Sequence, residues 1–189
     1  MKDMQGLISI KNKTVALVGS AGYLSEYSFG KEIDNHDIVV RVNKGVDIVN
    51  NTSFLKFGSK TDILYHHLLE DPKESNGPKF GFIEPEKWKK MGVKNIFCLP
   101  NSSFKGVATC NQLSNLVNIS NIKKIQDCLH LAMVDYKFYN SISSSINCKP
   151  NTGIVALCHL LAMNPEKLSV YGFSFLLDGW IKEYRDGIE

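Results

Sequence analysis

Residues 13–43 of this 189-residue chain read KTVALVGSAGYLSEYSFGKEIDNHDIVVRVN and contain two apolar segments separated by a glycine loop. The first segment, residues 13–19, is rich in β-branched residues and ends on glycine, which predicts a buried strand. The second segment, residues 37–43, has a continuous apolar centre and predicts another strand. The residues between them suffice for the helical crossover that parallel strands require, and we expect a short helix over 26–33. This stretch therefore predicts a βαβ unit.

The same alternation of strands and helices continues along the chain. Further strands are predicted at 61–65, 95–99 and 168–172, helices at 85–90, 116–129 and 153–163, a loop at 44–59 and a mobile polar excursion at 70–79. Alternating elements with continuously apolar strands indicate an α/β fold, in which helices cover both faces of a mostly parallel sheet. We expect one Rossmann-like domain over residues 1–189.

Composition excludes several classes of protein. Hydrophobic residues make up 43% and charged residues 22%, the values of an ordinary globular protein rather than a disordered tail, a disulfide scaffold or a fibrous repeat. A net charge of +3 without a basic stripe argues against a nucleic-acid partner. No apolar run is long enough to span a membrane. The five cysteines lack metal-ligand spacing, so we expect no metal site, reduced and mostly buried thiols, and a cytoplasmic location.

Two glycine-assisted helix starts are candidate anion sites. Gly19, Ser20, Ala21 and Gly22 form a loop after the first strand, where backbone N–H groups can approach a phosphate. A plain tight turn explains this loop equally well, because the third glycine of the dinucleotide fingerprint is missing. The second start consists of Asn151, Thr152 and Gly153; here Asn151 or Thr152 can cap the helix and leave N–H groups facing outward.

Two polar residues end the second strand. Ligands of open α/β sheets bind beyond the carboxyl ends of the strands, so we expect Asn43 to contact a ligand. For Arg41 we favour a structural ion pair with Asp37 or Asp62.

Residues 14–43 resemble the large sialylmotif of the family-29 glycosyltransferases, the sialyltransferases, with fitting spacing from the glycine loop to GKEID and on to RVN. Residues 150–173, beginning PNTGIVAL and ending LSVYGF, resemble the small sialylmotif, and the GSKTD stretch at 58–62 lies where that family has a similar one. Together these segments cover roughly a third of the chain, in the family's order.

The resemblance implies a GT-A-like variant of the Rossmann fold that binds a CMP-activated acidic sugar, either a sialic acid or the related acid Kdo. It implies inverting, metal-independent transfer to a glycan hydroxyl, with no cofactor beyond the CMP-sugar donor. By position, Asn43 contacts the nucleotide, residues 151–153 hold the phosphate or the donor carboxylate, and residues 19–22 form the floor under the nucleotide.

Two of the departures from the family concern the site itself. Ser20 stands where the family usually has asparagine, and no His-x-x-x-Glu motif follows the donor-binding core of residues 14–173. We therefore expect that the catalytic C-terminal segment is missing, and we leave the catalytic base unknown. Asp178, His66 and His67 are the nearby candidates, although a structural role as strand-end residues, partly packed and partly exposed to solvent, suits both histidines better.

Two further histidines and two rival functions complete the expectations. His36 is predicted to be structural and His159 to lie in the core. One rival function is a CMP-binding module that lacks its base, and the other is a dinucleotide-binding oxidoreductase. The absence of an acidic residue at the end of the second strand argues against the second rival.

Overall fold

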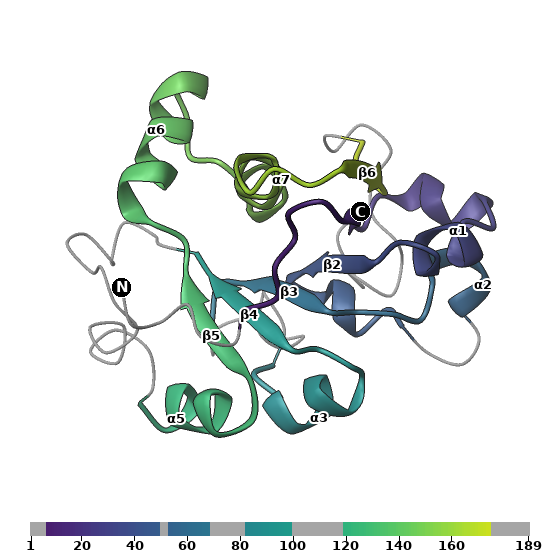
Figure 1. The fold of residues 1–189 in the computed structure, drawn as a ribbon, viewed down its shortest axis with the longest axis horizontal. Coiled ribbons are helices and arrows are strands. Elements are labelled where there is room, and N and C mark those ends of the chain that lie inside the picture. Colours follow the sequence, from purple (N-terminus) through teal and green to yellow (C-terminus); the bar gives the residue numbers. More distant parts are fainter. Residues whose placement is uncertain (1–6, 50–52, 69–81, 100–118, 175–189) are drawn as a thin grey trace.

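The computed structural model describes residues 7–49, 53–68, 82–99 and 119–174. Its six-stranded sheet has the order β5-β4-β3-β2-β1-β6, and every neighbouring pair is parallel (Figure 1). The strands are β1 (Thr14–Val18), β2 (Ile38–Val42), β3 (Ile63–His66), β4 (Asn95–Cys98), β5 (His130–Met133) and β6 (Lys167–Tyr171). This arrangement confirms the predicted α/β fold.

Helices cover both faces of the sheet, as Figure 1 shows. Along β1, Val15 and Leu17 point into one core with α7 (Thr152–Ala162) and α6 (Tyr136–Ile146). The alternate residues Ala16 and Val18 point into a second core with η1 (Gly22–Glu26), α1 (Gly30–Asp34) and α2 (Phe54–Phe57). On that second face, α3 (Pro85–Lys90) and α5 (Ile119–Cys128) pack against β3 and β4. This period-two alternation buries both faces of the central strands.

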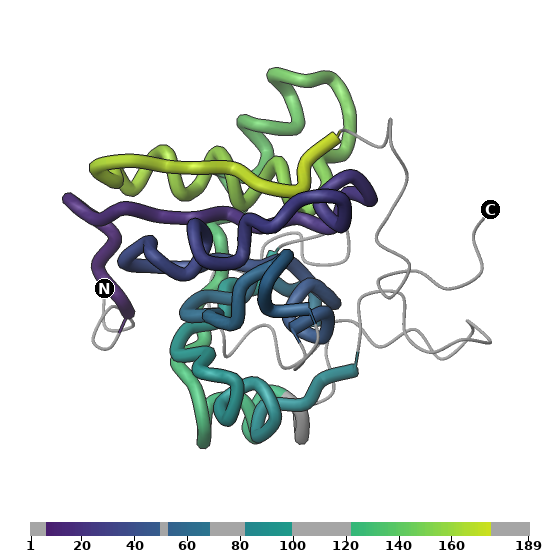
Figure 2. Tube along the Cα trace, turned by 90° about the vertical axis from the view of Figure 1, so that its right-hand side faces the viewer, coloured from purple at the N-terminus to yellow at the C-terminus, as the bar shows by residue number. Residues whose placement is uncertain are grey.

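Strand β6 joins the sheet from far along the chain. Its residue Lys167 pairs with Thr14 of β1, and Figure 2 shows the yellow end of the described chain beside the purple beginning. The chain steps from β1 through β5 in one direction and then returns to place β6 on the other side of β1. The sheet therefore has a topological switch point between β1 and β6.

Several elements differ from the predictions. The helix expected over 26–33 is a 3-10 turn (Gly22–Glu26) followed by a single helical turn (Gly30–Asp34). The expected loop 44–59 contains the end of a second 3-10 turn, η2 (Asn43–Val46), and the short helix α2. Strand β5 and helix α6 were not predicted. The polar excursion 70–79 lies outside the described residues.

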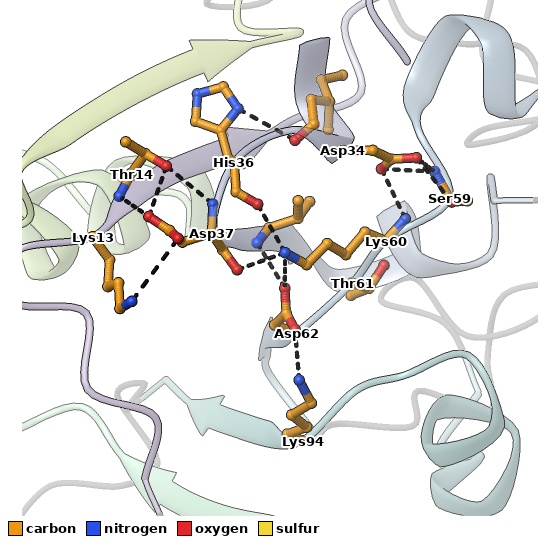
Figure 3. A network of polar contacts seen from close by, with 12 residues as sticks. Lys13, Thr14, Asp34, His36, Asp37, Ser59, Lys60, Thr61, Asp62 and Lys94 are labelled. Atoms are coloured by element: carbon orange, nitrogen blue, oxygen red, sulfur yellow. Dashed lines mark hydrogen bonds and ion pairs between the residues drawn. The ribbon is translucent and has the colours of Figure 1, made fainter. Parts of the chain in front are cut away.

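A polar network at the amino ends of the strands holds them in register (Figure 3). The Asp37 carboxylate accepts hydrogen bonds from the Thr14 N–H at 2.8 Å and from its hydroxyl at 2.9 Å. The Asp62 carboxylate accepts from the Val39 N–H at 3.0 Å and from the Lys94 ammonium at 3.0 Å. These contacts tie the starts of β1 to β4 together at the edge opposite the candidate site.

None of the helices in the described part of the chain is long and apolar enough to cross a bilayer.

Candidate ligand site at the carboxyl edge of the sheet

The predicted ligand residues gather at the carboxyl edge of the sheet, around the switch point. Gly19 follows β1, Asn43 follows β2, and Phe173 lies just beyond β6. In open α/β sheets, ligands bind in the crevice beyond the strand ends at such a point, because the connecting helices diverge to opposite faces. The fold therefore brings the two predicted glycine-assisted turns to one place.

Asn43 joins three elements at this edge. Its Nδ2 donates to Oγ1 of Thr152 at 3.0 Å, and its Oδ1 accepts from the His67 N–H at 3.4 Å. Its φ of 45° lies in the left-handed region, which asparagine tolerates better than most residues. Asn43 and Thr152 are both buried, at 6% and 5% exposure. The end of β2, the end of β3 and the start of α7 are thus fixed relative to one another.

Helix α7 begins at this contact, and its cap is Asn151. The Asn151 Oδ1 accepts from the Ile154 N–H at 2.9 Å, so Asn151, not Thr152, is the N-cap. An α-helix leaves its first N–H groups without intrahelical partners, and its dipole places partial positive charge there. Thr152 and Gly153 occupy the first turn and are buried. This helix start is suited to bind an anionic group.

The glycine loop after β1 is closely bonded to the end of β6. The Gly19 N–H donates to the Tyr171 carbonyl at 2.8 Å, and the Ala21 N–H donates to the Gly172 carbonyl at 2.9 Å. The Gly172 N–H in turn donates to the Tyr23 hydroxyl at 2.9 Å. Two N–H groups of the loop are thus already satisfied within the fold. Binding at Ser20 and Gly22 stays a prediction.

Phe173 is a residue at this site that sequence reasoning missed. A Cβ added at Gly19 would lie 2.8 Å from the ring of Phe173 and would overlap with the Gly172 carbonyl oxygen. A Cβ at Gly153 lies 2.5 Å from Cε1 of the same ring. Both glycines therefore have a packing reason in addition to any role with phosphate, because Phe173 lies close to both turns. The sequence holds no signal for this contact between distant segments.

The histidines near the site are packed into the fold. His66 Nδ1 accepts from the Leu68 N–H at 2.9 Å, and its ring lies 5.2 Å from that of Trp88. His66 and His67 are buried, at 1% and 6% exposure, so they are packed strand-end residues, and the partial exposure to solvent that we expected is wrong. His36 is structural, as predicted, since its Nδ1 faces the Glu32 carbonyl at 2.9 Å. Asp178 lies outside the described residues.

His159 packs among aromatic rings on the α7 side of the sheet. The Tyr65 hydroxyl and His159 Nδ1 share a hydrogen bond of 2.8 Å, and the Phe97 and Phe138 rings lie 5.1 and 5.5 Å from the His159 ring. Burial lowers the pKa of His159 to about 4 and raises the pKa of Tyr65. The predicted core position is confirmed, and His159 is neutral at pH 7.

The ion pair predicted for Arg41 is wrong, although its structural role is confirmed. Its guanidinium donates to the carbonyls of Phe57 at 2.6 Å and Gly58 at 3.3 Å, and to the Thr61 hydroxyl at 3.0 Å. Burial lowers the pKa of Arg41 to about 10, and the nearby Asp34 carboxylate partly opposes this shift. The predicted partners bind elsewhere: Asp37 and Asp62 hold the strand starts in register.

The cysteines also correct an expectation. Of the four described cysteines, only Cys98 is buried, while Cys128 and Cys158 are half-buried and Cys148 is exposed; all four are thiols. Cys110 lies outside the described residues. Across the described ranges, no three His, Cys, Asp or Glu side chains are grouped as a metal ion requires.

Comparison with known proteins assigns this architecture. A model of glycosyltransferase family 29 (sialyltransferase) matches residues 3–179. A CMP-N-acetylneuraminate-beta-galactosamide-alpha-2,3-sialyltransferase 1 from Mus musculus is 26% identical over 169 residues, which are 84% of this chain and 44% of the mouse protein. The Pan troglodytes protein of that name is 26% identical over 176 residues, 87% of this chain and 45% of its own length. The chain thus spans less than half the length of these relatives.

Solved structures show the same fold. A mammalian sialyltransferase superposes with a TM-score of 0.58 at 18% identity, over 94% of this chain and 60% of its own. A mammalian sialyltransferase in complex with Gal-beta-1-3GalNAc-ortho-nitrophenol gives a TM-score of 0.55 at 18% identity, over 89% and 58%.

Proposed function

The chain belongs to glycosyltransferase family 29, the sialyltransferases, and on this basis we propose that it binds a CMP-activated acidic sugar at the carboxyl edge of its sheet. The donor sugar is a sialic acid or a related 2-keto acid such as Kdo, transferred to a glycan hydroxyl with inversion and without a metal ion. One observation carries the proposal: Asn43 Nδ2 lies 3.0 Å from Thr152 Oγ1, so the two segments that resemble the sialylmotifs meet at one point.

The chemistry of this donor suits the charges at that point. When CMP departs from a ketose that carries a carboxylate, the sugar develops oxocarbenium character beside a fixed negative charge. Preorganised donors must then stabilise both the departing phosphate and the carboxylate. The first turn of α7, with the Thr152 hydroxyl and the N–H groups after the Asn151 cap, supplies such donors. Residues 19–22 are proposed to support the nucleotide from below.

Transfer also requires a base that removes the proton of the acceptor hydroxyl. His36, His66 and His159 have ring nitrogens engaged in hydrogen bonds within the fold, so we assign them no such role. A CMP-binding module that does not transfer the sugar is therefore the alternative, and it predicts donor binding without product.

Isothermal titration calorimetry tests the binding step. With EDTA present, we expect the chain to bind CMP and CMP-sialic acid and to ignore NADH. Thr152→Ala should weaken CMP binding by roughly 1.5–3 kcal/mol, the value of a hydrogen bond to a charged group. Ser145→Ala, which removes an exposed hydroxyl on α6, is the control and should bind CMP like the wild type. Binding of NADH but not CMP would contradict the proposal.

A transfer assay then separates the enzyme from the binding module. CMP-sialic acid and a galactose-terminated glycan are incubated with the chain, and the product and its anomeric configuration are followed by NMR. An inverted sialoside supports the transferase, whereas tight CMP binding without product supports the binding module.

A further inference from the structure

The turn that follows β6 is tied to the glycine loop by three hydrogen bonds. Two of them join backbone groups: the Gly19 N–H donates to the Tyr171 carbonyl, and the Ala21 N–H donates to the Gly172 carbonyl. In the third, the Gly172 N–H donates to the side-chain hydroxyl of Tyr23 at 2.9 Å. A bond between backbone groups does not depend on the side chains, whereas this one requires a hydroxyl at position 23. Of these three contacts, therefore, only the third is removed when a side chain is replaced.

The ring of Tyr23 is held in place independently of its hydroxyl. Its centroid lies 6.3 Å from that of Tyr27 in an edge-to-face arrangement, and Tyr27 in turn stacks on Phe29 at 5.3 Å. Both arrangements are favourable geometries for aromatic pairs. A phenylalanine at position 23 retains the ring contact and loses only the oxygen that accepts from the Gly172 N–H. The substitution Tyr23→Phe thus isolates this one hydrogen bond.

The turn that Tyr23 holds lies beside both glycine turns of the proposed donor site. Gly172 has a φ of 69°, in the left-handed region, and a Cβ added there would lie 2.9 Å from the Gly19 carbonyl oxygen. The next residue, Phe173, is half-buried, and its ring lies close to Gly19 and Gly153. An unrestrained glycine adopts a wide range of backbone conformations. The placement of Phe173 therefore depends on the contacts that restrain Gly172.

We propose that Tyr23 is a positioning residue of the donor site, which fixes Gly172 and thereby places Phe173 beside the two glycine turns before the donor binds. The inference rests on the proposed function, because the ligand is the CMP-activated donor. Tyr23 acts through the backbone of Gly172 and does not itself touch the donor. Without its hydroxyl, the two backbone bonds still attach the turn to the glycine loop, so the chain folds, but the donor must then order the turn on binding.

Calorimetric titration with CMP and amide hydrogen exchange followed by NMR test the proposal. The variants are Tyr23→Phe, Phe173→Ala and the double variant, each verified by thermal unfolding. Tyr171→Phe is the matched control, because its hydroxyl donates to Glu32 Oε1 at 2.7 Å, on α1 and not on the turn. Each tyrosine variant loses one hydrogen bond, so both should unfold about 2–4 °C below the wild type.

The expected result separates positioning from stability. Tyr23→Phe should weaken CMP binding about threefold to tenfold and speed the exchange of the Gly172 amide. Tyr171→Phe should bind CMP within about twofold of the wild type and leave that amide protected. In the Phe173→Ala background, Tyr23→Phe should weaken CMP binding by no further factor, because the side chain that it positions is missing. The comparison of the two tyrosine variants decides the question if Phe173→Ala unfolds.

Three outcomes overturn the proposal while the proposed function stands. If Tyr23→Phe binds CMP like the wild type, the restraint on Gly172 does not matter for the donor. If both tyrosine variants weaken CMP binding equally, the Tyr23 hydroxyl acts only through the stability of the fold. If the losses of Tyr23→Phe and Phe173→Ala multiply, Tyr23 acts independently of Phe173. A folded wild-type chain that binds no CMP at all would instead reject the proposed function together with this inference.

Discussion

At the scale of single residues, Arg41 shows how a buried charge can stabilise the fold without contacting a ligand. Its guanidinium is 1% exposed and donates to backbone carbonyls of the segment between α2 and β3. The Asp34 carboxylate accepts from the N–H groups of Ser59 and Lys60 and holds the same segment from outside (Figure 3). Arg41 thus supplies donors to backbone carbonyls of this irregular segment.

Replacing Arg41 should therefore destabilise the fold. Arg41→Lys keeps the charge but cannot donate from a planar fork to several carbonyls, so at least one buried oxygen loses its donor. We expect the free energy of unfolding to fall by about 2–4 kcal/mol, measured by urea denaturation. Lys31→Met, at an exposed position of α1, is the control and should change it by less than about 0.5 kcal/mol. Equal stabilities of Arg41→Lys and wild type would show that these hydrogen bonds contribute nothing.

The positions of the polar residues at the strand ends and helix starts were predicted from the sequence better than their hydrogen-bond partners were. Asn43, Thr152 and Gly153 were singled out because they sit at strand ends and helix starts, and the fold brings Asn43 to Thr152. The carbonyl partners of Arg41 could not be predicted, because a backbone oxygen carries no residue identity. Phe173 was missed for a related reason: its contacts are with residues that have no side chain.

At the scale of elements, the first turn of α7 requires a residue without a side chain at position 153. Gly153 lies inside the first turn, where glycine costs about 1 kcal/mol of helix stability relative to alanine. The structure gives the reason, since a Cβ there lies 2.5 Å from the Phe173 ring, which also lies against Gly19. At Gly153, therefore, the higher helix propensity of alanine and the steric clash of its Cβ with Phe173 oppose each other.

The effect of Gly153→Ala on the free energy of unfolding should depend on whether Phe173 is present. In the wild type, the clash should outweigh the gain in helix propensity and destabilise the chain by about 1–3 kcal/mol. With Phe173→Ala, the same change should be neutral or stabilise by up to about 1 kcal/mol. Urea denaturation of the four proteins measures this coupling. Gly45→Ala is the control, because a Cβ there meets only the Arg41 Cβ, at 3.7 Å. Equal effects in both backgrounds would mean that Phe173 does not constrain α7.

The elements that were predicted carry a clear pattern in the sequence. Strands β1 to β4 and β6 and helices α3, α5 and α7 were predicted from apolar runs or helical periodicity, although β6 lies at the end of the sheet with only Tyr171 buried. Strand β5 lies at the sheet edge, and none of its four residues is fully buried, so it has no such run. Helix α6 is rich in serine, and its clear local signal is Asp135, which accepts from the Phe138 N–H as an N-cap.

At the scale of the whole molecule, the order of the strands in the sheet could not be predicted from the local sequence patterns. Local patterns predict that strands exist, but the place of β6 beside β1 follows from contacts between residues far apart in the chain. That placement creates the switch point and brings residues 150–173 to residues 14–43. The resemblance to the two sialylmotifs anticipated this meeting, whereas hydrophobic periodicity did not.

The stability of the whole chain should depend on pH through groups that the fold keeps deprotonated. Burial lowers the pKa of His159 to about 4, against about 6.5 in an unfolded chain. Hydrogen bonds from the Thr14 N–H and hydroxyl lower the pKa of Asp37. Groups with lowered pKa values bind more protons when unfolded than when folded, so their contribution is present at neutral pH and is lost as the pH falls.

For His159 the loss should occur between about pH 6.5 and pH 4 and reach about 3 kcal/mol, because protonation places a positive charge on a ring that the fold removes from water. Urea denaturation of the wild type at pH 7, 5.5 and 4.5 measures it. His159→Gln keeps an acceptor for the Tyr65 hydroxyl but cannot titrate, so its stability should fall less steeply over this range. His130→Gln, at an exposed ring on β5, is the control and should follow the wild type. Parallel pH profiles for the wild type and His159→Gln would show that protonation of His159 does not limit the acid stability of the fold.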